Sequence, residues 1–463
     1  MIKFGTDGWR AVIAQDFTFD NLKIVSQAIA DYMNKQGSQK KKVVIGYDCR
    51  FLSAEFAQTV ALVMAANNIK AVLSSSPVPT PAVSLHTLYN KYDLGIMITA
   101  SHNGAEFNGL KIKTKDGGAA DKALTDRVEA LLYKTKPKIV SIDAAKEKKL
   151  LEIKDLTKFY VDFLKKLVDV TKIRKLKLKI LVDTMYGAGD NFIEKVLGKC
   201  AVTIEYTRNE YNPSFGGIHP EPIEENLQST IAKMNTGKYD FCVVLDGDAD
   251  RIATFDSKGN YVNAQVLLPL LSIHMIKNRK EKCGIGKTVV GSNIIDDVAL
   301  SLGAICYETP VGFKYISSLF QQGLICIGGE EAGGIGYSGY IPERDGSASC
   351  LMILEMMAHE HKSFDSLIGE LYKKYGRWFY SRTAIPVASL KKSIHDMKLP
   401  AQLFGKKVER INTLDGIKLI TKDSWLMFRQ SGTEPIVRVY SESKTKKEAD
   451  SLLQLGKKMI YDL

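Results

Sequence analysis

The sequence contains little cysteine, with 7 residues in 463. An odd number of cysteines, without the paired spacing of zinc ligands, argues against a disulfide framework and against a metal–thiolate site. Cys242, Cys306 and Cys326 lie inside apolar runs, where a free thiol acts as a small hydrophobic side chain. We therefore expect the chain to work in a reducing compartment.

Long hydrophobic runs are also absent. The longest apolar stretch, around residues 266–276, is interrupted by His274 and is too short to cross a bilayer. The first ten residues contain no apolar core of the kind found in a signal peptide. We expect a cytoplasmic protein that does not bind membranes.

Positive charge is in excess but is not concentrated, since 64 Lys and Arg against 52 Asp and Glu give a net charge of +12. The lysine-rich runs at residues 40–42, 146–149, 172–179 and 444–447 are scattered and contain no interleaved aromatic residues. Such runs do not predict a nucleic-acid partner. They indicate a solvated surface with a general attraction for anionic small molecules.

What the sequence does contain is an approximate internal repeat. The length predicts about three domains, and three times a strand, a helix, a strand, a helix and a strand lead into a polar loop. The expected strands are residues 43–48, 70–75, 94–99, 179–183, 202–207, 240–245, 287–291, 304–307 and 324–328. This alternation predicts α/β domains whose mostly parallel sheets are covered on both faces. The last section has short strands instead, such as 417–421 and 425–429, and residues 376–382 are expected to form the hinge before it.

Ser101 lies in the loop that follows the third strand of the first repeat, Thr-Ala-Ser-His-Asn-Gly. Ligands bind at the carboxyl ends of strands in open α/β sheets, and a hydroxyl there can act as a covalent nucleophile or carrier. The alternative is a turn in which Ser101 and Asn103 hydrogen-bond to their own backbone. The other two repeats end in equally unusual loops at equivalent positions, which favours the functional interpretation.

Asp246, Asp248 and Asp250 alternate in the loop that ends the second repeat. Carboxylates spaced in this way can turn several oxygens toward one hard cation such as Mg²⁺. A calcium EF-hand is excluded because the sixth position of the loop is Arg251 rather than Gly, and the twelfth is Ser257 rather than Glu. The alternative, a solvated acidic turn, would crowd three like charges at the end of a buried strand.

Three further segments offer groups for a phosphorylated ligand. Arg429-Gln-Ser-Gly-Thr supplies a guanidinium, two hydroxyls and a glycine, without any Walker pattern. Glu330 and Glu331, in the Gly-rich loop of the third repeat, can accept hydrogen bonds from sugar hydroxyls. Arg10, in Gly-Thr-Asp-Gly-Trp-Arg, can face a phosphoryl group. Each segment could instead be an ordinary turn.

Taken together, these motifs resemble a known family. FGTDGWR, TASHN followed by NGLKI, DGDADR, GEEAGG and RQSGTEP are similar to the loops of the α-D-phosphohexomutases, and they occur in the family's order over nearly the whole chain. The resemblance implies three topologically similar α/β domains with mostly parallel sheets, plus a C-terminal α+β domain, around a central cleft. It implies a phosphoserine-bearing domain at residues 1–155, a metal-binding domain at 156–256, a sugar-binding domain at 257–371 and a phosphate-binding domain at 372–463.

The resemblance also implies roles for individual residues. Ser101 would be the phosphoserine, and Asp246, Asp248 and Asp250 would hold Mg²⁺ together with its phosphoryl oxygen. The groups around the transferring phosphoryl would be Arg10, His102, Lys111 and Arg251. The substrate-binding residues would be Glu330 and Ala332 at the sugar, Lys314 and Arg344 beside it, and Arg429, Ser431, Gly432 and Thr433 at the phosphate that is not transferred.

The chain departs from the family pattern at two positions. Gly104 follows TASHN where many members have Pro, and Ala332 replaces the Ser of the usual Glu-x-Ser sugar loop, which removes one hydroxyl from sugar recognition. The Glu330-Glu331 pair is similar to that of the glucose-preferring members. We therefore expect a phosphoglucomutase, with glucose 1,6-bisphosphate as activator.

Such an enzyme would be an intramolecular phosphotransferase that acts on a small phosphosugar as a monomer or weak dimer. A phosphomannomutase or a dual-specificity phosphohexomutase is the alternative enzyme. A non-catalytic phosphosugar-binding protein is the alternative of another class. The presence of Ser101, the three aspartates and Arg251 argues against that last interpretation.

Overall fold

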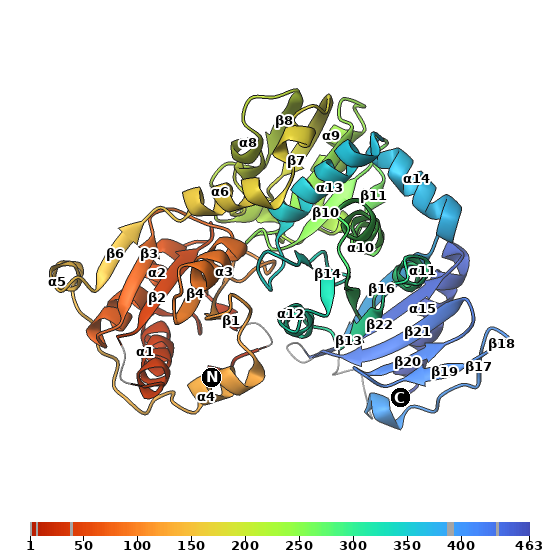
Figure 1. Cartoon of the computed structure of the whole chain (residues 1–463). Helices are drawn as coiled ribbons and strands as arrows, with labels where there is room; N and C mark the ends of the chain where they lie inside the picture. The colour runs from red at the N-terminus through yellow and green to blue at the C-terminus, as the bar shows by residue number, and fades with distance from the viewer. Residues whose placement is uncertain (1, 6–7, 38–39, 387–392, 432–434) are drawn as a thin grey trace.

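The structure, a computed structural model, describes residues 2–5, 8–37, 40–386, 393–431 and 435–463. Four sheets of four to six strands follow one another along this part of the chain. They form an arc with the first and the last sheet at its two ends (Figure 1). The predicted three α/β domains and C-terminal α+β domain are confirmed, and the sheet of the C-terminal domain is antiparallel.

The first domain contains a six-stranded sheet in the order β1-β5-β4-β2-β3-β6, in which β4, β2, β3 and β6 run parallel. Side chains of β2 alternate between its two faces, with Val43 and Ile45 packed among α1 and α2 and Val44 packed beside α3. This double burial explains the continuous apolar strands. The elements are β1 (Trp9–Val12), α1 (Phe19–Lys35), β2 (Lys42–Tyr47), α2 (Ser53–Ala66), β3 (Lys70–Ser74), α3 (Thr80–Tyr89), β4 (Leu94–Ile98), β5 (Phe107–Thr114), α4 (Lys122–Glu129), α5 (Ile142–Glu147) and β6 (Leu151–Lys154).

The second domain contains a five-stranded sheet in the order β11-β10-β9-β7-β8, with β9, β7 and β8 parallel. Its elements are α6 (Thr157–Leu167), α7 (Val170–Ile173), β7 (Leu178–Asp183), α8 (Phe192–Leu197), β8 (Val202–Thr207), α9 (Gln228–Met234), β9 (Phe241–Leu245), β10 (Ile252–Phe255) and β11 (Tyr261–Val262). Two short 3-10 turns, η1 (Phe215–Gly217) and η2 (Glu224–Asn226), lie between β8 and α9.

The third domain contains a four-stranded sheet in the order β13-β12-β14-β15, with β13, β12 and β14 parallel. Its elements are α10 (Ala264–Ile273), the π-helical turn η3 (His274–Asn278), β12 (Gly284–Thr288), α11 (Asn293–Ser301), β13 (Cys306–Thr309), α12 (Phe313–Gln321), β14 (Ile325–Gly329), β15 (Ile335–Tyr337), α13 (Gly346–Glu360) and α14 (Phe364–Tyr375). Helix α13 packs against β9 and β10 of the second domain, so these two domains share a core.

The C-terminal domain contains a five-stranded antiparallel sheet in the order β16-β22-β21-β20-β19, with α15 packed on it. Its elements are β16 (Phe379–Pro386), η5 (Ile394–Asp396), β17 (Gln402–Leu403), β18 (Lys406–Lys407), β19 (Arg410–Asn412), β20 (Ile417–Ile420), β21 (Ser424–Gln430), β22 (Ile436–Ser443) and α15 (Lys446–Tyr461). The change of strand rhythm in the sequence therefore marks a change from parallel to antiparallel pairing.

In each of the first three domains, the parallel strand that precedes the polar loop is followed by an antiparallel strand. The pairs are β4 with β5, β9 with β10, and β14 with β15. The polar loops after residues 98, 245 and 329 are therefore hairpin connections, and each contains a residue with positive φ: Ser101 (54°), Ala249 (54°) and Gly333 (98°). The sequence analysis did not predict these antiparallel strands.

One predicted strand and one predicted connecting segment differ in extent from the structure. Val289 and Val290 lie beyond β12 and pack against Trp425 and Met427 of the C-terminal domain, so their β-branched side chains serve a domain contact rather than a strand. Of the segment 376–382, which is predicted to form a hinge, only residues 376–378 lie between elements, because α14 ends at Tyr375 and β16 is paired with β22 from residue 379 onward. Its action as a hinge stays a prediction. The domain boundaries after 256 and 371 stay predictions; residue 256 lies in the turn between β10 and β11, and residue 371 lies inside α14.

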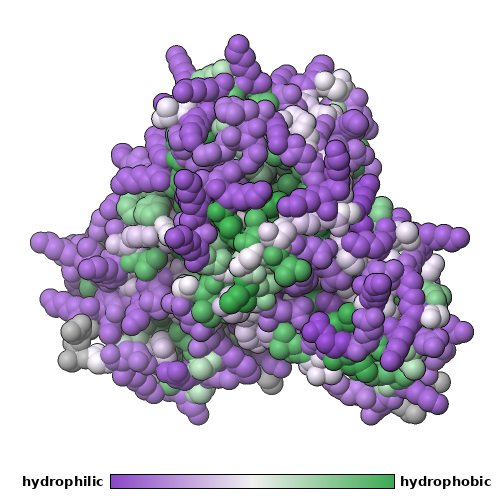
Figure 2. Space-filling view, turned by 45° about the vertical axis from the view of Figure 1, so that its right-hand side comes forward, coloured by the Kyte–Doolittle hydropathy of each residue, from purple (hydrophilic) through white to green (hydrophobic). Residues whose placement is uncertain are grey.

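The surface of the molecule is largely hydrophilic. On the face shown in Figure 2, hydrophilic side chains cover most of the molecule, and hydrophobic ones gather near its centre. Within the described ranges, we find no helix that is both long enough and apolar enough to cross a membrane. All seven cysteines are free thiols.

Glu355 on α13 joins the second and third domains. Its Oε1 accepts a hydrogen bond from Asp169 N (2.8 Å), and its Oε2 lies 3.0 Å from His274 Nε2 and 2.7 Å from Arg279 Nη1. Burial alone would raise the pKa of Glu355. The hydrogen bond with His274 and the charge of Arg279 outweigh that effect and lower the pKa to about 2.

We expect this joint to weaken in acid. A carboxyl whose ordinary pKa of 4.5 falls to about 2 on folding stabilises the fold above pH 4.5 and loses that contribution as the pH falls toward 2. The contribution is on the order of 3 kcal/mol. Unfolding of the natural protein and Glu355→Gln should be followed from pH 7 to 3.5, and their stability difference should shrink as the pH falls. Glu370→Gln, at an exposed ion pair with Lys362, is the control with a small, flat difference. A constant difference for Glu355→Gln would contradict this prediction.

Candidate active site

The hairpin loops of the first three domains meet at one point. A Cβ on Gly247 would lie 2.5 Å from Ser101 O, so only glycine lets the second loop approach the first this closely. A Cβ on Gly333 would lie 2.4 Å from Ile252 O, and Ile252 N donates a hydrogen bond to Gly333 O (2.9 Å). The three loops that the sequence analysis singled out therefore form one site.

Ser101 lies at the floor of this site rather than at an exposed strand tip, because it is fully buried. Its Oγ lies 3.2 Å from Asp246 Oδ2 of the second domain. Its backbone is held in the left-handed region by a hydrogen bond from Ser101 N to Thr99 Oγ1 (2.8 Å). A strained residue held in place by its surroundings is a frequent feature of functional sites.

A buried arginine that the sequence analysis missed supports the Ser101 loop. Arg50 pairs with Asp48 (Nε to Oδ2, 3.1 Å), and Asp48 also accepts a hydrogen bond from Thr99 Oγ1 (2.6 Å). The Arg50 guanidinium donates, at 2.6–3.0 Å, to four main-chain carbonyls of the loop: Ser101, Asn103, Gly104 and Phe107. The signal was present in the sequence, because Asp48-Cys-Arg50 also follows a buried strand of the first repeat.

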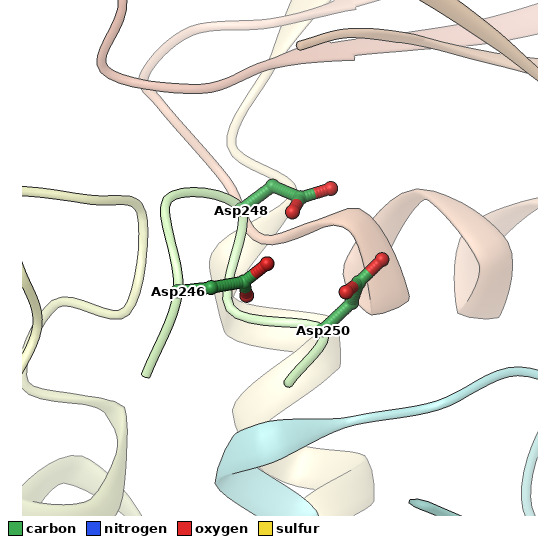
Figure 3. Close-up of side chains that lie close together, drawn as sticks. All are labelled: Asp246, Asp248 and Asp250. Carbon is green, nitrogen blue, oxygen red and sulfur yellow. The ribbon is translucent and has the colours of Figure 1, made fainter. Parts of the chain in front are cut away.

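Asp246, Asp248 and Asp250 form a compact, fully buried group. Each offers a carboxylate oxygen, and these atoms lie within 4.8 Å of one another. Figure 3 shows the three carboxyl groups turned toward a common space. Asp248 Oδ1 and Asp250 Oδ1 are buried without a hydrogen-bond partner among the residues that the structure describes. Buried oxygens of this kind fit a hard, oxygen-seeking cation such as Mg²⁺.

The electrostatics of the three carboxylates agree with that assignment. Burial, followed by the negative charges of Asp250 and Asp248, raises the pKa of Asp246. Burial also acts to raise the pKa of the other two. The pKa of Asp248 is nevertheless lowered by the positive charge of Lys111. The pKa of Asp250 is lowered by the positive charges of Arg344 and, to a smaller extent, Lys111. A bound cation would remove the remaining repulsion.

Cationic side chains from all three α/β domains surround the aspartates. Lys111 Nζ lies 2.8 Å from Asp248 Oδ2 and 3.1 Å from Asp250 Oδ2, and Arg344 Nη2 lies 3.0 Å from Asp250 Oδ2. Arg251 Nε lies 3.9 Å from Asp250 Oδ1. The structure thus brings together residues that are up to 233 positions apart in the sequence (344 minus 111).

His102 lies beside this group in surroundings that favour its neutral form. Burial, followed by the positive charges of Arg251, Arg10, Lys111 and Arg344, lowers its pKa well below 6.5. Its Nδ1 is buried, with no hydrogen-bond partner in the described part of the chain. A neutral imidazole can accept a proton, whereas the lysine and arginines can only donate hydrogen bonds while charged.

Arg10 faces the same loop from β1. Its Nη1 donates a hydrogen bond to Asn103 Oδ1 (2.8 Å), which places the guanidinium two residues from Ser101 along the loop. This position agrees with the expected contact to a phosphoryl group on Ser101.

The loop of the third domain places Glu330 next to the aspartates. Arg344 Nη1 lies 2.7 Å from Glu330 Oε2, so Arg344 links Glu330 to Asp250. Glu331 has a buried Oε2 without a hydrogen-bond partner among the described residues, and Ala332 lies at the half-buried turn of the hairpin.

In the C-terminal domain, Arg429 is the last residue but one of β21, and Ser431 directly follows that strand. Arg429 Nε donates a hydrogen bond to Asp415 Oδ2 (2.7 Å). Gly432 and Thr433 lie outside the described residues. Lys314 lies in the first turn of α12, with Nζ 5.1 Å from the ring centre of Tyr315.

Comparison with known families gives four consecutive matches. Models described as phosphoglucomutase/phosphomannomutase α/β/α domains I, II and III match residues 1–138, 158–259 and 263–375, and the model of the C-terminal domain matches residues 383–454. The four matches follow the four sheets of the structure.

Individual relatives cover the whole chain. A phosphoglucomutase/phosphomannomutase of Thermococcus kodakarensis is 31% identical over 461 residues, covering 99% of this chain and 98% of its own. A phosphoglucosamine/phosphogalactosamine mutase of Sulfurisphaera tokodaii is 28% identical, with the same two shares. A crystal structure from Thermus thermophilus, provisionally named a phosphomannomutase, superposes with a TM-score of 0.88 at 31% identity and 99% coverage of both chains.

Proposed function

The chain belongs to the phosphoglucomutase/phosphomannomutase family and is a phosphohexomutase, and on that premise we propose that it interconverts glucose 1-phosphate and glucose 6-phosphate. The reaction would pass through a phosphoserine at Ser101 and glucose 1,6-bisphosphate. The observation that carries this proposal is the buried Ser101 Oγ, 3.2 Å from one of three clustered aspartates. The net reaction is an intramolecular phosphoryl transfer of the isomerase class.

In the first half-reaction, a sugar hydroxyl attacks the phosphorus on Ser101. A bond forms between that oxygen and phosphorus while the bond from phosphorus to Ser101 Oγ breaks, and the hydroxyl proton passes through the site to Oγ. The bisphosphate then reorients, and its other phosphoryl returns to Ser101 by the same exchange in reverse. Phosphoryl transfer of this kind is accelerated mainly by positioning and by charge stabilisation.

The chain's own residues provide both effects. Arg50 and Thr99 hold Ser101 in place, while Arg10, Lys111 and Arg251 face the charge of the moving group. Mg²⁺, held by the three aspartates and a phosphoryl oxygen, would supply further positive charge when bound.

Two residues are candidates for moving the hydroxyl proton. Neutral His102, whose Nδ1 lacks a partner in the described ranges, is suited to accept it. Lys111 is the other candidate, and its Nζ contacts Asp248 Oδ2 (2.8 Å) and Asp250 Oδ2 (3.1 Å).

The substrate would lie in a central cleft among the four domains, with its reacting end toward Ser101. Glu330 accepts hydrogen bonds from sugar hydroxyls, and Arg344 and Lys314 face the sugar. Arg429, Ser431, Gly432 and Thr433 bind the phosphate that is not being transferred.

The relatives are named for several different sugars, so the proposed preference for glucose needs a direct test. We expect kcat/KM for glucose 1-phosphate to exceed that for mannose and glucosamine 1-phosphates by about tenfold or more, as is typical where hydroxyl contacts distinguish sugars. Steady-state rates should be measured with each sugar and its matching 1,6-bisphosphate. Ala332→Ser restores a hydroxyl to the sugar loop, and it should lower KM without reversing the order. A higher value for mannose or glucosamine would replace glucose as the assigned substrate.

A further inference from the structure

Asp415 connects Arg429 to the third domain. It lies in the turn between β19 and β20, and its Oδ2 accepts two hydrogen bonds. One comes from Arg429 Nε (2.7 Å), within the C-terminal domain, and the other from Val311 N (2.9 Å), in the third domain. A single carboxylate oxygen therefore joins the candidate phosphate-binding arginine to a neighbouring domain.

The segment around Val311 leads directly to the active site. Val311 is two residues before Phe313, the first residue of α12, and the guanidinium carbon of Arg344 lies 5.7 Å from the ring centre of Phe313. Arg344 in turn contacts Glu330 and Asp250. Phe313 and Arg344 therefore connect the contact at Asp415 to the sugar loop and to the clustered aspartates.

We propose that Asp415 is a positioning residue that orients Arg429 toward the substrate phosphate only when the C-terminal domain is seated on the third domain. This inference rests on the proposed role of Arg429. The charge-assisted bond engages Nε, the guanidinium nitrogen nearest the backbone, and so holds the planar group from behind. Because Val311 N donates to the same oxygen, the contact between the two domains and the orientation of Arg429 are coupled through Asp415.

Other contacts show that Asp415 is not needed merely to dock the domain. Asn412 Nδ2 donates a hydrogen bond to Glu308 Oε1 (2.6 Å), and Lys418 Nζ donates to Val289 O (2.6 Å). Both cross the same interface, and the buried cluster of Val289, Val290, Trp425 and Met427 adds apolar contact to it. Asn412 is therefore a matched control.

Asp415→Asn keeps an oxygen that can accept from Val311 N but removes the charge that holds Arg429. We expect KM for glucose 1-phosphate to rise about tenfold and more glucose 1,6-bisphosphate to be released per turnover, while the thermal midpoint and the phosphorylation of Ser101 stay unchanged. Asn412→Ala should leave KM within about twofold. Asp415→Glu, which keeps the charge, should recover part of the retention of bisphosphate.

A double-variant comparison separates positioning from a structural role. In an Arg429→Ala background, Asp415→Asn should add nothing to the defect, because the group that it orients is gone. If Asp415→Asn behaves like Asn412→Ala, or if its effect is equally large without Arg429, the inference is wrong. If Arg429→Ala itself leaves KM and bisphosphate release unchanged, the proposed phosphate-binding role of Arg429 fails instead.

Discussion

Ser101→Ala leaves the protein folded and lowers its turnover by at least about 10³-fold, since no other group can carry the phosphoryl in the covalent route proposed here. The substitution removes one oxygen atom from a fully buried residue whose main-chain contacts with Thr99 and Arg50 do not involve that atom. The loop should therefore keep its shape. The aspartates and cations around it also remain in place, so the variant should still bind glucose 1,6-bisphosphate.

Two measurements check this result. Intact mass of the protein purified from cells should show a phosphate-sized increment on a fraction of the natural molecules, and none at this position in Ser101→Ala. Steady-state turnover should fall, while the thermal midpoint stays close to that of the natural protein.

A matched control is available in the same domain. Ser26 is equally buried, and its hydroxyl donates to Leu22 O within α1 (2.7 Å). Ser26→Ala makes the same chemical change away from the site and should keep full turnover. Near-native turnover in Ser101→Ala would mean that the phosphoryl does not pass through this serine.

Removing the metal has the second large effect. Exhaustive chelation should abolish turnover, and Mg²⁺ should restore it. The three buried carboxylates include two oxygens that lack a partner in the described ranges. The negative charge of the phosphoryl group must be placed beside them, so a cation is needed to offset the repulsion. Asp248→Asn removes one charged ligand and should raise the Mg²⁺ concentration for half-maximal activity about tenfold or more.

Thermal stability gives a readout that does not depend on turnover. Mg²⁺ that binds only the folded state should raise the thermal midpoint of the natural protein, and the rise should be smaller for Asp248→Asn. Asp256→Asn changes an aspartate of the same domain that lies in the β10–β11 turn, outside the cluster, and it should respond to Mg²⁺ like the natural protein. Full activity after chelation, or an equal Mg²⁺ response in Asp248→Asn, would contradict the metal assignment.

Part of the active site could be predicted from the sequence because its polar residues directly follow apolar strands. Ser101 and the three aspartates follow strands that are apolar throughout, and such strands predict a sheet covered on both faces. Small, polar and charged residues at the end of such a strand have no part in the core, so their position itself indicates a function. The sequence also showed that the last domain has short strands, but not that they pair antiparallel.

The two lysines of β5 are residues whose burial the local sequence pattern does not predict. Lys111 and Lys113 are fully buried in a strand, which sequence alone argues against for a charged side chain. Their partners lie in other domains, with Asp248 and Asp250 beside Lys111 and Glu343 beside Lys113 (2.5 Å). Burial of these charges becomes possible only once the three domains pack together.

The sequence by itself indicated which residues are proposed to carry the chemistry: Ser101 and the three aspartates, each in a loop that follows a strand, and a set of basic groups elsewhere in the chain. Only the tertiary structure decided how these residues are held. Arg50 beneath the Ser101 loop and Asp415 behind Arg429 act through hydrogen bonds to main-chain atoms and to other domains. The contact of Asp415 with Val311 depends on how two domains pack, and sequence spacing does not indicate where another domain will lie. The contacts of Arg50 lie within one domain, and they depend on how the Ser101 loop folds back over the end of β2.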